Sequence, residues 1–330
     1  EAIDGAAYPL GPVLAVEQIQ ARLKQEGRRL AYVVPPESGA LGFTVACLVA
    51  AKLGLAVVDG DGAGRAVPSL PMLTFAAQHV DPKPAVLVSQ DGLTVELDVT
   101  PAKGGARGDR QHQEDVSVIV EQMMRPIVAD PEFKQFGGLA MWVMTPAKLR
   151  DAVPITGTLT RALAFGQALQ QGEFKSVDAL LAGLHERWGV RACALFPTGT
   201  LLGAAVDTSG GFDLGTVTIK AAAHTAEVLY QNESLLAWAS DRAQPLCMAP
   251  DSICYFFESP GDAVASNGDV VEDNGGLNPG YKGRPVTVIG LSANPHLRQH
   301  GGLILDSFMQ QVNQLGYRGP YVPVEKLAAM

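Results

Sequence analysis

Clustered basic residues are scarce in this sequence. The chain of 330 residues has 25 lysines and arginines against 34 aspartates and glutamates, which gives a formal net charge of −9. Its longest basic run is the pair Arg28-Arg29. Nucleic-acid binding depends on clustered Lys and Arg side chains that displace counterions from phosphates. The composition therefore argues against a nucleic-acid partner.

Long apolar segments are absent as well. The most apolar stretch, residues 43–58, contains Lys52 and is too short to cross the hydrocarbon core of a bilayer. It predicts a buried helix followed by a buried strand. No basic region followed by an apolar run marks a signal peptide near the N-terminus. We therefore expect a cytoplasmic protein with no membrane partner.

Cysteine is rare and follows no motif. The four cysteines are Cys47, Cys193, Cys247 and Cys254, and none belongs to a Cys-x-x-Cys pair. Without metal-ligand spacing they are expected to be buried thiols of a reducing compartment. The sequence also lacks a Gly-x-Ser-x-Gly elbow and a Cys–His nucleophile pattern, so a covalent serine or cysteine mechanism is not expected.

The sequence does contain enough apolar residues, 47%, for two hydrophobic cores. A short apolar run at 30–34, a helical pattern at 42–53 and a second run at 55–58 predict a strand–helix–strand unit with a parallel sheet. Residues 86–99 predict a hairpin with Asp91-Gly92 as its turn. Residues 101–114 are polar and glycine-rich and predict a mobile loop.

From residue 191 the pattern changes to short β-prone runs separated by glycines and turn residues, including 192–196 and 201–206. This spacing is typical of a small antiparallel barrel or sandwich. The predicted fold class is therefore α/β, a layered N-terminal domain followed by a β-barrel-like domain. The expected boundaries are 1–190 for the α/β domain, 191–295 for the β-rich domain, and 296–330 for a tail that returns to the α/β domain.

The most charged loop follows the predicted strand at 55–58. Its sequence is Asp59-Gly60-Asp61-Gly62-Ala63-Gly64-Arg65, with two carboxylates and one guanidinium. In open parallel sheets, ligands bind at the carboxyl ends of the strands, and glycines let the backbone approach a ligand closely. We expect this loop to be the functional site. The alternative is an Asp-Gly turn with Arg65 in a structural ion pair.

A dinucleotide site is not expected in this loop, although its glycines are similar to that fingerprint. Such a site needs a helix that begins directly after the glycines, so that its amide groups meet the pyrophosphate. Pro68 and Pro71 follow too soon for such a helix, and no acidic residue ends a second strand about 20 residues later. The sequence therefore predicts no NAD or FAD cofactor.

Five other polar residues are candidates. Glu37 follows the first predicted strand after two prolines, and a solvated loop glutamate is the alternative. Thr156 and Thr158 flank a glycine at the start of a predicted helix, where they could hold an anionic group, with ordinary N-capping as the alternative. Asn232 and Glu233 lie between two predicted strands, facing an expected interdomain cleft, and a turn is the alternative.

Six motifs in one order carry a resemblance to a known family. They are residues 58–66 followed by Pro68, Thr156-Gly-Thr158 leading into Arg161, Gln231-Asn-Glu233, Ala249-Pro-Asp251, residues 283–290 (GRPVTVIG), and Tyr321-Val-Pro-Val-Glu325. Together they resemble the S-methyl-thiohydantoin desulfurase-like family over about residues 30–325.

The resemblance implies an α/β domain followed by a β-barrel domain, and a small cyclic amide or thiohydantoin as substrate. It also implies hydrolysis of an S-alkylated thiohydantoin to a hydantoin and a thiol. One departure stands out: the family has a glycine-rich segment before the position that matches Glu1, and this sequence has none. The chain is therefore expected to be either a fragment or a member without that segment.

The predicted function is that of a hydrolase acting on a hydantoin-like ring. Water would add to the ring carbon that bears sulfur, with Asp61 or Glu37 as the base and Arg65 beside the developing negative charge. A divalent metal held by Asp59 and Asp61 is an alternative to part of this arrangement. A non-catalytic binding subunit or partner of a hydantoinase-type enzyme is the alternative function. The oligomeric state stays open, with a homo-oligomer as one alternative.

Overall fold

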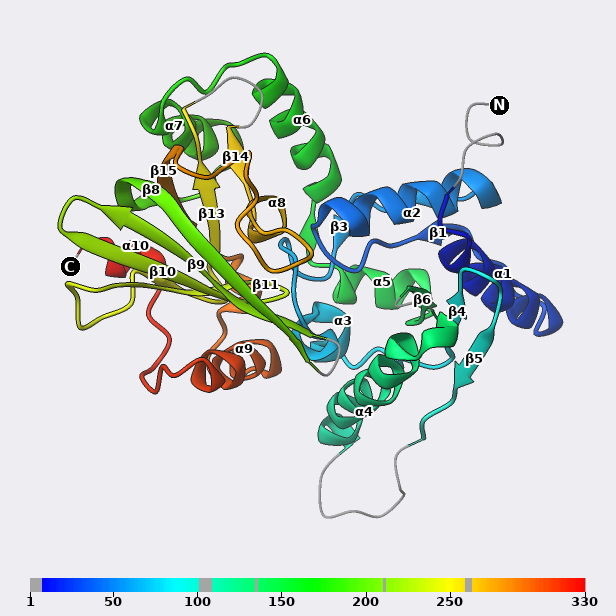
Figure 1. Cartoon of the computed structure of the whole chain (residues 1–330). Coiled ribbons are helices and arrows are strands. Elements are labelled where there is room, and N and C mark those ends of the chain that lie inside the picture. The colour runs from blue at the N-terminus through cyan, green and yellow to red at the C-terminus, as the bar shows by residue number, and fades with distance from the viewer. Residues whose placement is uncertain (1–7, 101–108, 134–135, 210–211, 259–262, 330) are drawn as a thin grey trace. The chain divides into compact units, whose positions relative to one another are not determined.

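The computed structural model describes residues 8–100, 109–133, 136–209, 212–258 and 263–329, and Figure 1 shows its helices and strands. The chain divides into two compact units. The first unit comprises residues 1–64 and 69–156, and the second comprises residues 65–68 and 157–330. Each unit has hydrophobic clusters of its own.

The first unit combines helices with three small sheets. Strands β1 and β2 pair in parallel, Tyr32 with Ala56 and Val33 with Val57, and α2 connects them. This arrangement confirms the predicted strand–helix–strand unit. The elements of the first unit are α1 (Leu10–Gln25), β1 (Tyr32–Val33), α2 (Ala40–Leu53), β2 (Ala56–Val57), β3 (Gly60–Asp61), η1 (Leu70–Met72), α3 (Thr74–Ala77), β4 (Ala85–Ser89), β5 (Thr94–Leu97), α4 (Asp109–Ala129), η2 (Pro131–Phe133), β6 (Gly137–Ala140), α5 (Pro146–Ala152) and β7 (Ile155–Thr156).

The central strand of the three-stranded antiparallel sheet β5-β4-β6 is buried on both faces. Because successive side chains of a strand point to opposite faces, β4 serves two clusters. Val86 and Val88 pack with residues of α1, whereas Ala85 and Leu87 pack with residues of α4. The predicted hairpin is present, since β4 and β5 pair antiparallel. This packing fixes α1 on one face of the sheet and α4 on the other.

Gly138 in β6 lies where the backbone of α1 passes at very short range. A Cβ atom on Gly138 would lie 2.0 Å from the backbone N and 2.3 Å from the Cα of Pro12. Both are backbone atoms and cannot turn aside, so we expect Gly138→Ala to lower the free energy of unfolding by about 2 kcal/mol, as overpacking does. Urea unfolding measures the difference.

Gly166→Ala in α6 is the matched control for this substitution. No atom lies within 4 Å of the Cβ that this substitution would add. The urea midpoint of unfolding should therefore equal that of wild type or exceed it, because Ala has a higher helix propensity than Gly. Equal unfolding midpoints for Gly138→Ala and wild type would contradict the close approach of α1 and β6.

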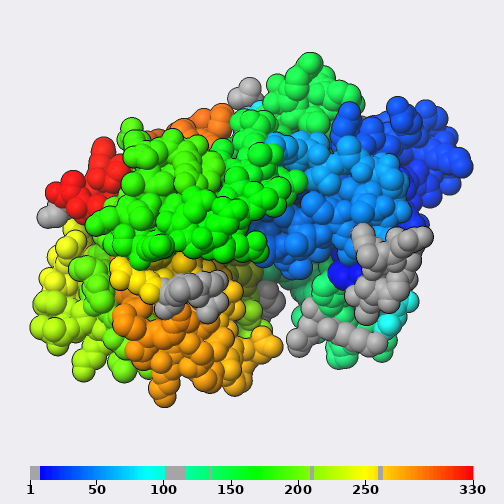
Figure 2. All heavy atoms as spheres, turned by 90° about the horizontal axis from the view of Figure 1, so that it is seen from above, coloured from blue at the N-terminus to red at the C-terminus, as the bar shows by residue number. Residues whose placement is uncertain are grey.

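Helix α2 is less buried than the sequence predicts. Only Ala46, Val49 and Ala50 are buried, whereas Leu41 is 68% exposed and Cys47 is exposed. The blue surface in Figure 2 includes this helix. The prediction of a buried helix is wrong here, because nearly every residue of α2 is apolar and composition alone does not show which face packs.

Helix α4 begins at Asp109, within the segment predicted as a loop. The first part of that segment, residues 101–108, lies outside the described residues. Within the described ranges, no helix has both the length and the apolar character needed to cross a membrane.

The second unit is built on one large antiparallel sheet of strand order β12-β11-β10-β9-β8-β15-β13-β14. The two edge strands, β12 and β14, do not pair with each other, so the sheet is open and the predicted barrel is not confirmed. The elements of this unit are α6 (Thr158–Gln170), α7 (Val177–Trp188), β8 (Ala192–Ser209), β9 (Phe212–Ala221), β10 (His224–Gln231), β11 (Glu233–Ala239), β12 (Cys247–Met248), β13 (Ser252–Phe256), β14 (Val264–Ala265), α8 (Asn267–Val270), β15 (Pro285–Leu291), η3 (Pro295–Leu297), α9 (Leu303–Gln314) and α10 (Val324–Leu327).

Strand β8 replaces two strands that the sequence predicts at 192–196 and 201–206. Pro197 and the glycine that follows at 199 suggest a break, but the strand continues through them. Its register with β15 shifts between Val286 and Val288, which is opposite this segment. A bulge of this kind accommodates a proline, which cannot donate a hydrogen bond to the neighbouring strand.

Two clusters cover the sheet of the second unit. Helices α6 and α7 pack on it through Ala168, Leu180 and Leu184, together with Phe256 and Ile289 from the strands. A separate cluster holds most of the other buried strand side chains, including the fully buried Tyr255. The strands of this sheet therefore contribute buried side chains to both clusters.

Candidate functional site

Asp61 organises the glycine loop of the first unit. Its side chain is completely buried, and its Oδ1 atom accepts hydrogen bonds from the backbone N–H groups of Ala63 at 2.8 Å and Gly64 at 2.6 Å. The Oδ2 atom accepts a hydrogen bond from the Ser38 hydroxyl at 2.6 Å. A buried carboxylate requires such partners. The loop is therefore folded around this one side chain.

The segment that follows β1 is attached to the same loop at two points. The carbonyl oxygen of Pro36 accepts a hydrogen bond from Gly62 N–H at 2.9 Å, and Ser38 donates to Asp61. Glu37 lies between these two attachment points and is half-buried. The carboxyl ends of parallel strands meet at one edge of a sheet, and here the ends of β1 and β2 bring Glu37 and the loop together.

Thr156 lies beside the glycine loop because its strand pairs with β3. It lies opposite Gly60 in the antiparallel pair β3–β7, and its side chain is exposed. Asp59, directly before β3, is exposed as well. The first unit therefore places four of the predicted site residues, Glu37, Asp59, Asp61 and Thr156, around one loop.

The contacts of Asp61 predict a clear difference between two substitutions. In Asp61→Asn the amide oxygen can accept hydrogen bonds from the same two backbone N–H groups. The amide nitrogen can donate a hydrogen bond to the Ser38 hydroxyl, which is able to accept one. We expect a change in unfolding free energy below about 1 kcal/mol. Asp61→Ala leaves the three donors without a partner and should cost about 4 kcal/mol. Urea unfolding of both variants measures this, and equal losses would show that the loop does not depend on these hydrogen bonds.

Arg65 belongs to the second unit and is engaged by backbone carbonyl groups there. It is 8% exposed. Its Nη1 atom donates to the carbonyl oxygens of Pro250 at 2.7 Å and Asp251 at 3.0 Å, and its Nη2 atom donates to that of Ser234 at 3.3 Å. Its guanidinium also lies 5.3 Å from the centre of the Phe308 ring. The side chain connects three separate segments of the second unit.

The predicted substrate contacts in the second unit have different surroundings. Asn232 has a left-handed backbone, with φ of 58°, and its Oδ1 atom accepts a hydrogen bond from Asp213 N–H at 2.9 Å. Glu233 follows as the first residue of β11 and is half-buried. Thr158, the first residue of α6, is 5% exposed, and its hydroxyl has no hydrogen-bond partner among the described residues. Asn232 therefore shapes a turn, and Thr158 retains a hydroxyl donor.

Asp251 is a buried centre of the second unit that the sequence analysis did not select. Its carboxylate accepts hydrogen bonds from Ala293 N–H at 2.7 Å, Val324 N–H at 2.7 Å and the Tyr321 hydroxyl at 3.0 Å. Burial raises the pKa of this carboxyl above its usual value, against these three hydrogen bonds, which lower it. Asp251 and Tyr321 both lie in motifs that carry the family resemblance, and that was the available signal.

The thiols of the second unit are poor nucleophiles. Burial raises the pKa of Cys193 to about 11, with Asp251 and Glu325 adding to the effect, and it raises the pKa of Cys254 to about 12. The thiolate is the reactive form of cysteine, and a thiol with such a pKa stays protonated near neutral pH.

A metal shared by Asp59 and Asp61 stays a prediction. The Asp61 Oδ1 atom already accepts two hydrogen bonds and Oδ2 accepts one, so a cation would bind beside the contacts that hold the loop together. Across the described ranges, no group of three or more His, Cys, Asp and Glu side chains is arranged to hold a metal ion.

Comparison with known proteins identifies the family. A family model for the S-Me-THD-like N-terminal domain matches residues 10–99, and one for the S-Me-THD-like C-terminal domain matches residues 114–324. The chain belongs to the S-Me-THD-like family. This membership confirms the resemblance that the six motifs carry.

One solved structure is similar to this chain over nearly the whole length of the chain. It is a crystal structure of a protein from Chromobacterium violaceum, with 51% sequence identity and a TM-score of 0.85. The match covers 98% of this chain and 81% of that one. A comparison with curated proteins gives no match.

Proposed function

We propose that this S-Me-THD-like protein hydrolyses the carbon–sulfur bond of an S-alkyl-thiohydantoin, releasing a thiol and leaving a hydantoin. The observation that supports this most directly is the fixed position of Glu37. It lies between two residues that both bond to the glycine loop, at the carboxyl edge of β1 and β2. A carboxylate held at such an edge is suited to take a proton from water.

Glu37 is a better candidate for the base than Asp61. The Asp61 carboxylate is completely buried and already accepts three hydrogen bonds, so it acts as a positioning residue. Glu37 and Asp59 are the less buried carboxylates beside the loop. The exposed Thr156 hydroxyl, opposite Gly60, supplies a donor near the loop.

The proposed reaction has two steps. Glu37 takes one proton from water while the water oxygen bonds to the ring carbon that bears sulfur, and the electron pair of the C=N bond moves to the ring nitrogen, which receives this proton from Glu37. The new hydroxyl group then loses its proton as the carbonyl forms and the C–S bond breaks, and the departing thiolate takes up that proton. The net change is one water consumed and one thiol released. No oxidant or reductant is required.

A thiol-release assay tests this proposal. Purified protein is incubated with an S-methyl-thiohydantoin, with and without added Mg²⁺, Mn²⁺ or Zn²⁺, and methanethiol and hydantoin are measured together. The proposal expects equal amounts of both products. Hydantoin itself is the control substrate, since it has no C–S bond and should not be consumed.

A non-catalytic binding subunit is the second candidate function. It expects saturable binding of the thiohydantoin, visible by calorimetry, with no thiol released under any metal condition. That result would replace the hydrolase proposal. Consumption of hydantoin with ring opening would instead point to a different bond as the target.

A further inference from the structure

Gly62 is the residue of the glycine loop that connects it to helix α3. Its carbonyl oxygen accepts a hydrogen bond from Thr74 N–H at 2.7 Å, and the Thr74 hydroxyl donates in turn to the carbonyl oxygen of Ala152 at 2.6 Å. The N–H group of Gly62 donates to the carbonyl oxygen of Pro36 at 2.9 Å. Gly62 therefore joins three segments: the loop, α3, and the segment that carries Glu37.

The side chain of Phe75 fills the space beside this junction. A Cβ atom on Gly62 would lie 2.7 Å from Pro36 O, 3.1 Å from Phe75 Cζ and 3.2 Å from Leu73 Cδ2. Because all three atoms lie close to this one point, the tip of the Phe75 ring lies beside the Gly62–Pro36 hydrogen bond. Phe75 is 2% exposed, so its ring is closely packed on its other sides as well.

Trp142 holds Phe75 in this position. The two ring centroids are 5.3 Å apart with an interplanar angle of 69°, which is the edge-to-face geometry that aromatic pairs favour. Trp142 is 7% exposed and lies between β6 and α5. The contacts therefore run from Trp142 to Phe75 and from Phe75 to the loop.

Trp142 occupies its place under strain. Its φ is 57°, in the left-handed region that a bulky side chain rarely adopts. Its buried Nε1–H group has no hydrogen-bond partner among the described residues. Unfavourable features of this kind persist where the surrounding structure requires a side chain in one place, and they cluster near functional sites.

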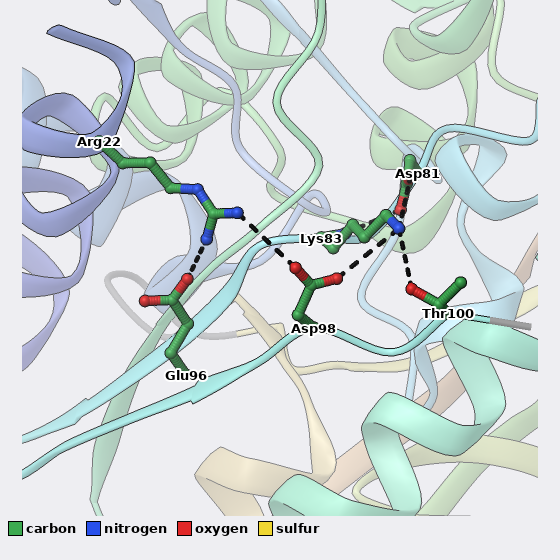
Figure 3. Close-up of polar contacts among 6 residues, drawn as sticks. All are labelled: Arg22, Asp81, Lys83, Glu96, Asp98 and Thr100. Atoms are coloured by element: carbon green, nitrogen blue, oxygen red, sulfur yellow. Dashed lines mark hydrogen bonds and ion pairs between the residues drawn. The ribbon is translucent and has the colours of Figure 1, made fainter. Parts of the chain in front are cut away.

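The sheet that leads to Trp142 is joined to α1 by ion pairs at its edge strand. Figure 3 shows Arg22 of α1 with Glu96 of β5 and with Asp98. Asp98 also lies 3.6 Å from Lys83 Nζ. Because these charges are paired with one another, we assign them to the fold. They align α1 with β5, and β4 joins β5 to β6, the strand that precedes Trp142.

We propose that Phe75, supported by Trp142, is a positioning residue for Glu37. Its ring fixes Gly62, Gly62 holds Pro36, and Glu37 follows Pro36 directly. The inference rests on the proposed role of Glu37 as the base. A base must lie within hydrogen-bond reach of the proton it takes, and a misplacement of about 1 Å can lower a rate by about 10²-fold. A shift of Gly62 would be carried to Glu37 by the backbone.

Phe75→Leu tests the inference without a substrate. Leucine is shorter than phenylalanine and leaves a void beside Gly62, so the Gly62–Pro36 hydrogen bond should open more often. Amide hydrogen exchange of Gly62, followed by NMR in protein labelled with ¹⁵N-glycine, should become at least about tenfold faster. Phe75→Met should restore most of the protection, because the longer methionine side chain fills irregular gaps.

Phe133→Leu is the matched control. Phe133 is also 2% exposed and lies in the first unit, but it packs in the cluster beside α4. The control should lower the stability of the unit to a similar extent and leave the exchange of Gly62 close to that of wild type. Equal exchange of Gly62 in Phe75→Leu and Phe133→Leu would overturn the proposal.

Steady-state thiol release links this junction to the reaction. Phe75→Leu should lower kcat by about 10–100-fold with KM changing much less, and Phe133→Leu should stay near wild type. Fast exchange of Gly62 with a wild-type kcat in Phe75→Leu would overturn the link to Glu37. A wild-type protein that releases no thiol would refute the proposed function instead, and the exchange of Gly62 would still decide whether Phe75 fixes the junction.

Discussion

Replacing Glu37 by Gln should lower the rate of thiol release by about 10²–10⁴-fold, the contribution usual for a general base. The substitution keeps the shape of the side chain and removes its ability to accept a proton from water. The attachments of Pro36 and Ser38 to the loop do not involve the Glu37 carboxylate, so the loop should keep its form. Steady-state kinetics should show the loss in kcat, with KM changing much less.

Glu17→Gln is the matched control for this experiment, because Glu17 is an exposed glutamate on α1. It should have wild-type kinetics and stability. If Glu37→Gln releases thiol at the wild-type rate, Glu37 is not the base. A Glu37→Gln protein with a lowered unfolding midpoint would show that Glu37 acts through the fold.

Arg65→Met should lower the free energy of unfolding of the second unit by about 4 kcal/mol. The methionine side chain has similar length but no donors, so the carbonyl groups of Ser234, Pro250 and Asp251 would lose their shared partner. Each buried acceptor left without a partner costs about 1–3 kcal/mol. Urea unfolding followed by Trp238 fluorescence, in a variant with the other tryptophans replaced, would report on this unit.

Arg318→Met provides the comparison, because Arg318 is an exposed arginine of the same unit. Its free energy of unfolding should match that of wild type within about 0.5 kcal/mol. A loss for Arg65→Met no larger than that of Arg318→Met would mean that the three carbonyl contacts do not hold the unit together. Arg65 would then be available for the role near the reacting atoms that the sequence suggests.

The position of the loop could be predicted from the sequence because it depends on local patterns. Two short apolar runs with a helix between them define a parallel pair, and the carboxyl ends of such strands meet. Asp59 follows one of these runs directly, and Glu37 follows the other after two prolines. Their proximity therefore required no knowledge of long-range packing.

The contacts of Arg65 could not be predicted in the same way. The three carbonyl groups it meets lie about 170 to 186 residues further along the chain, and backbone carbonyls carry no sequence signature. Similarly, Ser38 is an ordinary loop serine until Asp61 is placed 2.6 Å from it. Partners of this kind are set by tertiary packing.

The open sheet illustrates a different limit. Alternating short β-prone runs indicate an antiparallel sheet, but they do not show whether its last strands meet. In this protein β12 and β14 end the sheet as separate edges, and β8 continues through Pro197 where the sequence suggests a break. Closure and bulges depend on register, which local patterns do not specify.

Incorporation of oxygen from labelled water tests the central claim most directly. The protein and an S-methyl-thiohydantoin are incubated in H₂¹⁸O, and the hydantoin product is analysed by mass spectrometry. The proposed reaction places one ¹⁸O atom in the carbonyl that replaces the C–S bond, with one methanethiol released for each labelled ring. An unlabelled hydantoin, or label found only in a ring-opened product, would contradict it.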